Sequence, residues 1–172
     1  MSIIDDLEIR QPRNGESAKP YHDYICELIE ENTHLLMDKK PTLNEEKKWL
    51  KEKLKAIRRN ECIYLGAWQG KGLVGSCEAR KGRYKERNNV AIGIAIRKGY
   101  RGKGLGEYLI RHAIALSKKK LKPKNIYLYV STENIPAKSL YKKVGFREFA
   151  RFPKWELHNG RYIDSIYMLL KM

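Results

Sequence analysis

Cysteine is scarce in this sequence of 172 residues, where only Cys26, Cys62 and Cys77 occur. These cysteines form no C-x-x-C pair and no cluster with the four histidines, which argues against a zinc site. An odd number of cysteines cannot form a complete disulfide framework, and a chain of this length does not need one. We therefore expect three reduced thiols and no metal.

Long hydrophobic runs are missing as well. The longest unbroken apolar stretch, counting glycine, is 90–96, whereas a membrane-spanning helix needs about 20 residues. Asp5, Asp6 and Glu8 near the start fit neither the basic region of a signal peptide nor an acidic-poor transit peptide. We expect a soluble protein of the cytoplasm with no membrane partner.

Acidic residues are outnumbered, because Lys and Arg total 36 against 20 Asp and Glu, for a net charge of +16. Such a surface attracts polyanions, among them nucleic acid, anionic lipid and nucleotide-like cofactors. Net charge alone does not choose among these, since a lysine-rich proteome also yields basic proteins that have no polyanionic partner. An apolar content of 42% excludes a disordered chain, and the length suits one domain spanning 1–172.

Two hydrophobic periods alternate along the chain. Helical spacing of apolar residues occurs at 21–31, after the capping box Thr42–Glu45, at 105–119 and after Asn134. Strand-like segments lie at 7–12, 62–68, 73–79, 90–96, 126–130, 147–157 and 162–170. The order β-α-α-β-β-β-α-β-α-β-β predicts an α+β fold, a mixed central sheet of about seven strands flanked by about four helices. Because 90–96 shows no alternation, we expect both of its faces to be buried, as in a central strand.

The glycine-rich stretch 100–106, Tyr-Arg-Gly-Lys-Gly-Leu-Gly, lies between that strand and an amphipathic helix. Glycines let successive backbone N–H groups point into one concavity, and the helix N-terminus adds its dipole, which suits a pyrophosphate. A Walker loop counted from Gly99 fails, because Leu105 stands where its lysine must be. The dinucleotide spacing also fails, because Glu107 or Leu109 stands where its third glycine must be. A plain tight turn is the structural alternative.

Arg101-x-x-Gly104-x-Gly106 after a strand resembles the signature of the GNAT superfamily of acetyl-CoA-dependent N-acetyltransferases. A second block, 134–146, is similar to that family's Asn-x-x-Ala-x-x-x-Tyr-x-x-x-Gly-Phe helix. The resemblance covers 90–146 closely, and the element order of the remaining chain agrees with it. Two motifs in the right order, thirty residues apart, are far more specific than either motif alone. We therefore expect a GNAT-like fold.

The resemblance implies acetyl-CoA as co-substrate. The main chain of Ile94, Ala95 and Ile96 would pair with the pantetheine arm, and an N–H at or beside Ile96 would hold the thioester oxygen. Asn134 would contact the arm near the thiol. The pyrophosphate would lie on a cradle made by the segment that begins at Arg101, with the amides of Gly102, Lys103, Gly104, Leu105, Gly106 and Glu107.

Tyr141 would face the sulfur and act as general acid, because a phenol near a leaving thiolate can donate a proton as charge develops. The alternative is a core aromatic, since Tyr141 shares one helical face with Ala137, Leu140 and Val144. We favour the acid because the family pattern places a tyrosine here.

The general base is less well defined. Some relatives that acetylate protein N-termini carry a glutamate on the strand after the cofactor helix, where this sequence has Tyr129. Glu78 is our candidate substitute, acting through an ordered water, although it could instead be an edge-strand surface charge. Glu133 and Asp164 are weaker candidates.

The acceptor would be a primary amine, either a protein N-terminus or a small amine or polyamine, bound by the first two helices and the C-terminal hairpin. Glu27, Glu30 and Glu31 could supply carboxylates for a polyamine, although a solvated helical face explains them as well. The oligomeric state is open, with a homodimer among the alternatives. The rival hypotheses are a nucleic-acid-binding module, disfavoured because the basic residues are scattered over every element, and a CoA-binding protein without catalysis.

Overall fold

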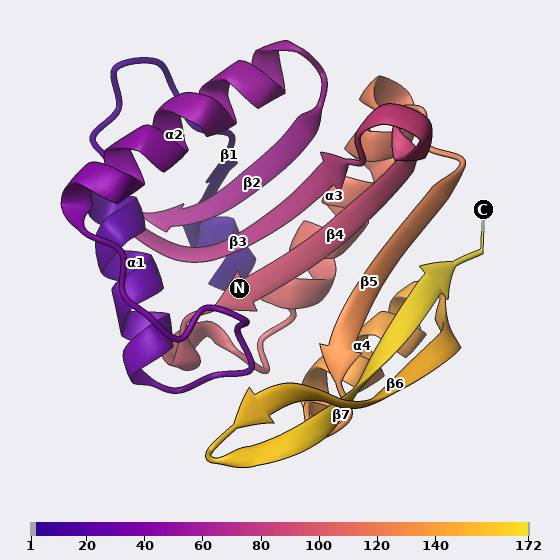
Figure 1. Cartoon of the computed structure of the whole chain (residues 1–172). Helices are drawn as coiled ribbons and strands as arrows, with labels where there is room; N and C mark the ends of the chain where they lie inside the picture. The colour runs from indigo at the N-terminus through magenta and orange to yellow at the C-terminus, as the bar shows by residue number, and fades with distance from the viewer. Residues whose placement is uncertain (1–2, 172) are drawn as a thin grey trace.

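The structure is a computed structural model that describes residues 3–171. Within these residues, seven strands form one sheet in the order β1-β2-β3-β4-β5-β7-β6 (Figure 1). The strands are β1 (Glu8–Arg10), β2 (Cys62–Gln69), β3 (Gly72–Lys81), β4 (Asn89–Ile96), β5 (Asn125–Ser131), β6 (Phe146–His158) and β7 (Arg161–Leu170). Four α-helices accompany them in the described chain: α1 (Lys19–Glu30), α2 (Leu43–Arg58), α3 (Leu105–Lys120) and α4 (Ile135–Val144). The expected mixed α+β sheet is confirmed.

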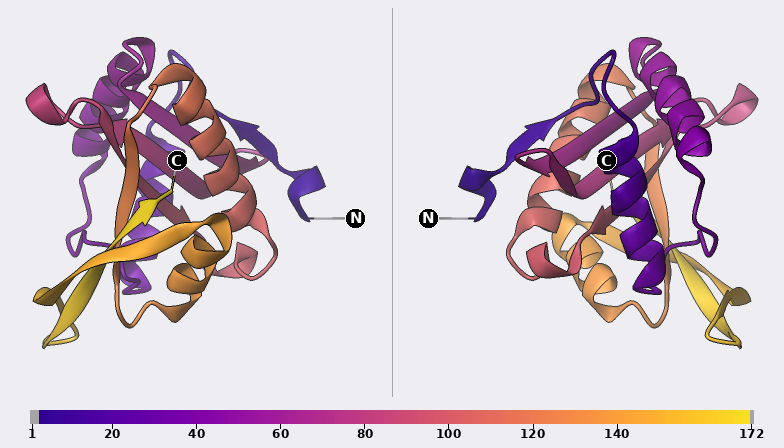
Figure 2. Two further views of the ribbon diagram at one scale, coloured as in Figure 1. Left: turned by 90° about the vertical axis from the view of Figure 1, so that its right-hand side faces the viewer. Right: turned by 90° about the vertical axis from the view of Figure 1, so that its left-hand side faces the viewer.

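The helices cover the two faces of the sheet unequally (Figure 2). Helices α1 and α2 lie on one side, which we call the front face, and their apolar stripes meet Tyr64, Trp68 and Leu73. Helices α3 and α4 lie on the back face, where Leu109 and Tyr141 join the larger core. The front of β5 and β7 carries no helix (Figure 1).

Local sequence signals set the helix ends as expected. Thr42 caps α2 by accepting the Glu45 N–H at 3.2 Å, while the Glu45 carboxylate accepts the Thr42 N–H at 2.7 Å. Asn134 caps α4, which ends at Gly145 with φ +111°.

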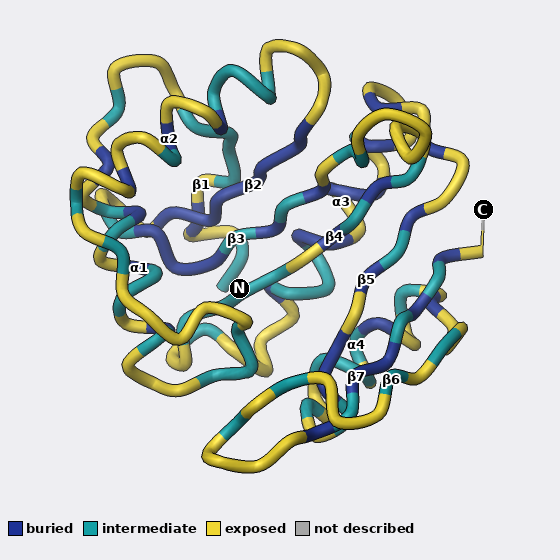
Figure 3. The backbone as a smooth tube through the Cα atoms, viewed as in Figure 1, coloured by how far each residue is buried: buried dark blue, intermediate teal, exposed yellow. Residues whose placement is uncertain are grey.

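A tight turn closes the C-terminal hairpin. Asn159 and Gly160, with φ of +50° and +72°, form the turn of the exposed β6–β7 hairpin (Figure 3). This hairpin meets the α1–α2 connection, because Asn32 donates to Asn159 at 2.5 Å and the rings of His34 and His158 stack 4.8 Å apart. We call these two contacts the front bridge.

The burial expected for 90–96 is wrong in part. Strand β4 is central, between β3 and β5, and its back-facing residues Val90 and Ile92 are buried. Gly93 is exposed and the residues from Ile94 to Ile96 are only half-buried. The physical reason is that β5 diverges from β4 beyond Ala91, so one edge of the apolar run has no neighbouring strand.

Candidate functional site

Strands β4 and β5 form a wedge. Their parallel pairing runs from Asn89 opposite Asn125 to Ala91 opposite Tyr127, and beyond these pairs the strands separate (Figure 1). In contrast, β4 stays paired with β3 as far as Ile96 opposite Gly75. One edge of β4 therefore loses its strand partner where the sequence predicts the pantetheine arm.

The alternation of a strand fixes which backbone groups enter the wedge. The Arg97 N–H donates to the Val74 carbonyl on β3 at 2.9 Å, so the groups of Ile94 and Ile96 point the other way, toward the wedge. Ala95 faces β3, and its carbonyl also accepts the Tyr24 hydroxyl at 2.6 Å. Of the three residues expected to meet the arm, Ile94 and Ile96 are oriented for it.

The predicted cradle lies at the wide end of the wedge. Gly102 and Gly104 both have positive φ, +71° and +85°, and Gly104 is the N-cap of α3. This cap provides no side-chain hydrogen bond, so the first-turn amides of Leu105, Gly106 and Glu107 have no capping acceptor. Their N–H groups and the helix dipole together suit a bound anion.

The charged side chains of the cradle are tied to neighbouring groups. Arg101 donates to the Ile96 carbonyl at 2.8 Å and forms a two-pronged ion pair with Glu31. Glu107 is paired with Arg111 and Lys143, whose hydrogen bonds lower the pKa of its carboxyl. The negative charge of Glu107 is thus offset, while Arg101 fastens the end of β4 to α1.

Helix α4 carries Asn134 at its N-cap and Tyr141 in the core behind the sheet. The Asn134 side-chain oxygen accepts the Ala137 N–H at 3.3 Å, which fixes the start of the helix. Tyr141 is 6% exposed within the back core, and burial followed by nearby Cys77 raises the pKa of its phenol well above 10. The phenol therefore stays protonated at neutral pH, as a general acid must.

The side chain of Glu78 is held by two cations. Lys53, 1% exposed, lies 2.5 Å from one carboxylate oxygen, and Arg80 lies 2.9 Å from the other. Lys53 also lies over the rings of Trp49 and Tyr64. The alternative of an edge-strand surface charge is wrong, because β3 lies between β2 and β4 and only 30% of this side chain is exposed. Gly93 is the cross-strand partner of Glu78, beside the wedge.

We expect the two partners of the Lys53–Glu78 ion pair to affect stability unequally when each is replaced. Glu78→Ala leaves an ammonium buried without its counter-ion and should cost about 3 kcal/mol of unfolding free energy. Lys53→Met removes the buried charge instead and leaves Glu78 half-exposed beside Arg80, so we expect a loss of about 1 kcal/mol. Urea denaturation of both variants measures the difference. Equal losses of unfolding free energy in the two variants would mean that the unpaired buried ammonium is not what destabilises Glu78→Ala.

Tyr129 stands where some relatives carry a base, but it cannot serve as one at neutral pH. Burial, then the neighbouring Tyr167, raises the pKa of its phenol. Its ring lies on the front face and is 40% exposed. Glu133 and Asp164, the weaker candidates, are ion-paired with Arg161 and Arg151.

Several site residues escaped the sequence analysis. Tyr24, which holds the Ala95 carbonyl, looked like one more apolar residue in a helical stripe. Lys53 looked like a solvent-facing lysine, and Arg97, whose side chain pairs with Glu27 at 3.2 Å, carried no signal beyond following the strand. The partners of these three residues lie 25 to 71 positions away in the sequence. Hydrophobic periodicity describes only neighbouring residues, so it could not predict these contacts.

The three thiols are free, and none is activated. Cys62 and Cys77 are fully buried, and burial raises the pKa of Cys62 to about 12 and that of Cys77 further. Burial also raises the pKa of Cys26. A cysteine nucleophile is therefore disfavoured at neutral pH.

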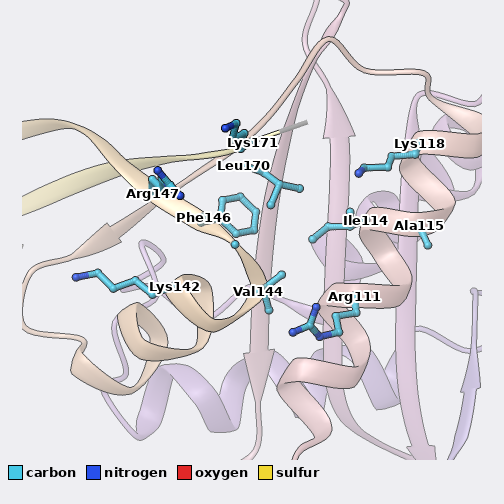
Figure 4. Close-up of a pocket in the computed structure, with 11 residues that line it drawn as sticks. Arg111, Ile114, Ala115, Lys118, Lys142, Val144, Phe146, Arg147, Leu170 and Lys171 are labelled. Carbon is cyan, nitrogen blue, oxygen red and sulfur yellow. The ribbon is translucent and has the colours of Figure 1, made fainter.

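A second concavity lies away from the wedge, between α3 and the start of β6 (Figure 4). Its volume is about 700 Å³, and its rim carries five cationic side chains: Arg111, Lys118, Lys142, Arg147 and Lys171. It contains none of the predicted site residues. These cations add to the positive field that attracts anionic compounds to this protein.

Within residues 3–171, no three His, Cys, Asp or Glu side chains are grouped closely enough to hold a metal ion. None of the helices in this described range has the length and apolarity required to cross a bilayer.

Comparisons with known proteins agree with this geometry. A model of the acetyltransferase (GNAT) family matches residues 21–146. The L-amino acid N-acetyltransferase AaaT of Escherichia coli is 35% identical over 83 residues, which cover 48% of this chain and 51% of that protein. The chain thus spans about half the length of this curated relative.

Two solved structures have a similar fold. A GNAT-family acetyltransferase from Streptococcus pneumoniae superposes with a TM-score of 0.82 at 22% identity, covering 95% of this chain and 98% of that one. A spermidine N-acetyltransferase from Vibrio cholerae, solved with CoA and spermine, gives a TM-score of 0.79 at 24% identity, covering 96% and 95%.

Proposed function

Because the chain belongs to the GNAT family of acetyltransferases, we propose that it transfers an acetyl group from acetyl-CoA to a primary amine. The observation that carries this proposal is the coincidence of three features at one wedge. Main-chain groups of Ile94 and Ile96 face the gap between β4 and β5, and the glycine cradle begins the helix that follows. A Cβ on Gly106 in the first turn of α3 would lie near both Ile94 and Leu140, the chain neighbour of Tyr141 on α4.

The residues present suit acetyl-CoA. The amides that begin α3 would hold the pyrophosphate, as a helix N-terminus holds anions. Ile94 would pair with the amide-rich arm in the manner of an added strand, and Asn134 would lie beside it near the sulfur. When bound, acetyl-CoA supplies an activated acyl group whose thiol is a good leaving group.

The chain's own residues would then serve the transfer. The Ile96 N–H would donate to the thioester oxygen as negative charge builds on it during attack by the amine nitrogen. Tyr141 would give its proton to the departing sulfur. Glu78, through a water, would accept the proton that the amine loses, so the net change moves one proton from nitrogen to sulfur.

The acceptor is a protein N-terminal amine or a small amine. AaaT acts on amino acids by its name, which supports an α-amine. The three free thiols suit a cytoplasmic location, where thiols stay reduced.

Thermal unfolding with and without acetyl-CoA tests the proposal. At 100 times its dissociation constant, a ligand of the folded state adds about 2.7 kcal/mol, which should raise Tm by about 5–10 °C in a chain of this size. A duplex oligonucleotide should not match this shift. Thiol release with an amine panel then separates an enzyme from a protein that binds CoA without catalysis.

A further inference from the structure

One row of side chains crosses the front face of the sheet beside the wedge. Glu78 on β3 is the register partner of Gly93 on β4, and Tyr129 on β5 is the partner of Tyr167 on β7. The β4–β5 register, Asn89 opposite Asn125, places Gly93 opposite Tyr129 across the gap. Residues of one row point to the same face, so Gly93 is the position in this row without a side chain.

Gly93 leaves a hollow in the row. It is exposed, and a Cβ atom built on it would meet no atom within 4 Å. Glycine weakens a strand interior and often marks a place where another molecule approaches the backbone closely. Here the backbone becomes approachable from the front, next to the Ile94 and Ile96 groups that face the wedge.

Across the gap from Gly93, four aromatic side chains of β5, β6 and β7 form a cluster that we call the aromatic wall: Tyr127, Tyr129, Phe152 and Tyr167. The ring of Tyr167 lies 5.5 Å from that of Tyr129, 6.0 Å from that of Tyr127 and 4.9 Å from that of Phe152. Burial raises the phenol pKa of Tyr127 and Tyr129, so both rings stay uncharged. The wall lies on the part of the front face that carries no helix (Figure 1).

Most carboxylates around the wedge are already paired with a cation, whereas Glu156, near Tyr129, accepts the Ser165 hydroxyl instead. Five of them pair with a cation: Glu27 with Arg97, Glu31 with Arg101, Glu78 with Lys53, Glu133 with Arg161, and Asp164 with Arg151. Glu30 pairs with Lys40, so all three acidic residues that could serve a polyamine, Glu27, Glu30 and Glu31, are paired with a cation. A polycation would have to displace these partners.

We propose that the hollow over Gly93 receives the acceptor's amino group, and that the aromatic wall receives an aromatic or large aliphatic side chain on the neighbouring carbon. This inference rests on the proposed acetyl transfer and names its acceptor class. The acceptor is an α-amine next to an apolar side chain. A free amino acid and a polypeptide N-terminus share this chemistry.

A panel of amines at saturating acetyl-CoA tests the class, with thiol release as the readout. Phenylalanine and a tripeptide that begins with phenylalanine stand for the two sources, and glycine, a tripeptide that begins with glycine, and spermidine are the comparisons. We expect the better phenylalanine compound to exceed its glycine counterpart and spermidine at least tenfold in kcat/KM. Equal kcat/KM values for these amines, or a preference for spermidine, would overturn this inference about the acceptor but not the proposed acetyl transfer. Turnover with none of the five would overturn the proposed transfer as well.

Substitutions at Gly93 and at Tyr129 test where the acceptor binds. Gly93→Val places its Cβ atom where no atom lies within 4 Å and fills the hollow with a branched side chain, so kcat/KM for the phenylalanine acceptor should fall about 100-fold. Its Tm and its stabilisation by acetyl-CoA should not change. Gly72→Val, on the far β2–β3 hairpin, is the matched control and should leave kcat/KM unchanged.

Tyr129→Ala removes part of the wall and should bring the phenylalanine-to-glycine ratio down to about 1. A ratio that survives this change, or a Gly93→Val enzyme of normal kcat/KM, would show that the acceptor lies elsewhere.

Discussion

Tyr141→Phe should lower kcat by about 100- to 1000-fold while the protein stays folded, because a general acid contributes factors of that order. The substitution removes one oxygen from a ring that is otherwise surrounded by the back core, including Phe146 at 6.0 Å between ring centroids. Binding of acetyl-CoA should change by less than about threefold. Steady-state thiol release and the acetyl-CoA-induced Tm shift measure the two effects separately.

The pH profile gives this prediction a second readout. Burial disfavours the phenolate, so the pKa of Tyr141 is raised and its acid form persists well above pH 10. In the wild type, kcat/KM should therefore rise as the acceptor amine loses its proton and should show no descending limb up to pH 10. A fall between pH 8 and 10, or a Tyr141→Phe enzyme with normal kcat, would assign the proton donation to another group.

Gly104→Val should weaken acetyl-CoA binding by about 100-fold. Gly104 has φ +85°, which a β-branched residue does not tolerate, so the loop must rearrange and the amides at the start of α3 lose their common orientation. Isothermal titration with CoA measures the dissociation constant.

Gly15→Val is the matched control for backbone strain. Gly15 also has positive φ, +76°, and a Cβ there would meet nothing within 4 Å. Both variants should lose about 1–2 kcal/mol of stability, but Gly15→Val should bind CoA normally. If the two variants bind CoA equally well, the loop before α3 is not the pyrophosphate site.

Much of the fold could be predicted because local patterns specify it. The capping box at Thr42 and the Asn-Gly turn at Asn159 each place a chain reversal or a helix end, and hydrophobic periods separate strands from helices. The cradle was also predictable, since its glycines and the helix that follows are contiguous in sequence. Acetyl transfer followed from the family resemblance rather than from the residues alone.

The acceptor side could not be predicted in the same way. The opposition of Gly93 and Tyr129 depends on a parallel register that pairs residues 36 positions apart in the sequence, and the hollow depends on the divergence of a neighbouring strand. Gly93 simply interrupted an apolar run in the sequence. The pairing of the acidic residues of α1 with Arg97, Lys40 and Arg101 is likewise a matter of three-dimensional proximity.

The short ladder between β4 and β5 also gives the sheet a joint. Only three residue pairs connect a four-stranded half of the sheet to a three-stranded half, so a small rotation about Ala91 and Tyr127 would change the separation of β4 and β5 without breaking the strand ladders inside either half. At the opposite end, the front bridge fastens the two halves together through one amide contact and one ring stack. On the back face, one continuous core joins Val90 and Ile92 of β4 to Ile126 and Leu128 of β5, so the width of the wedge is constrained on both faces of the sheet.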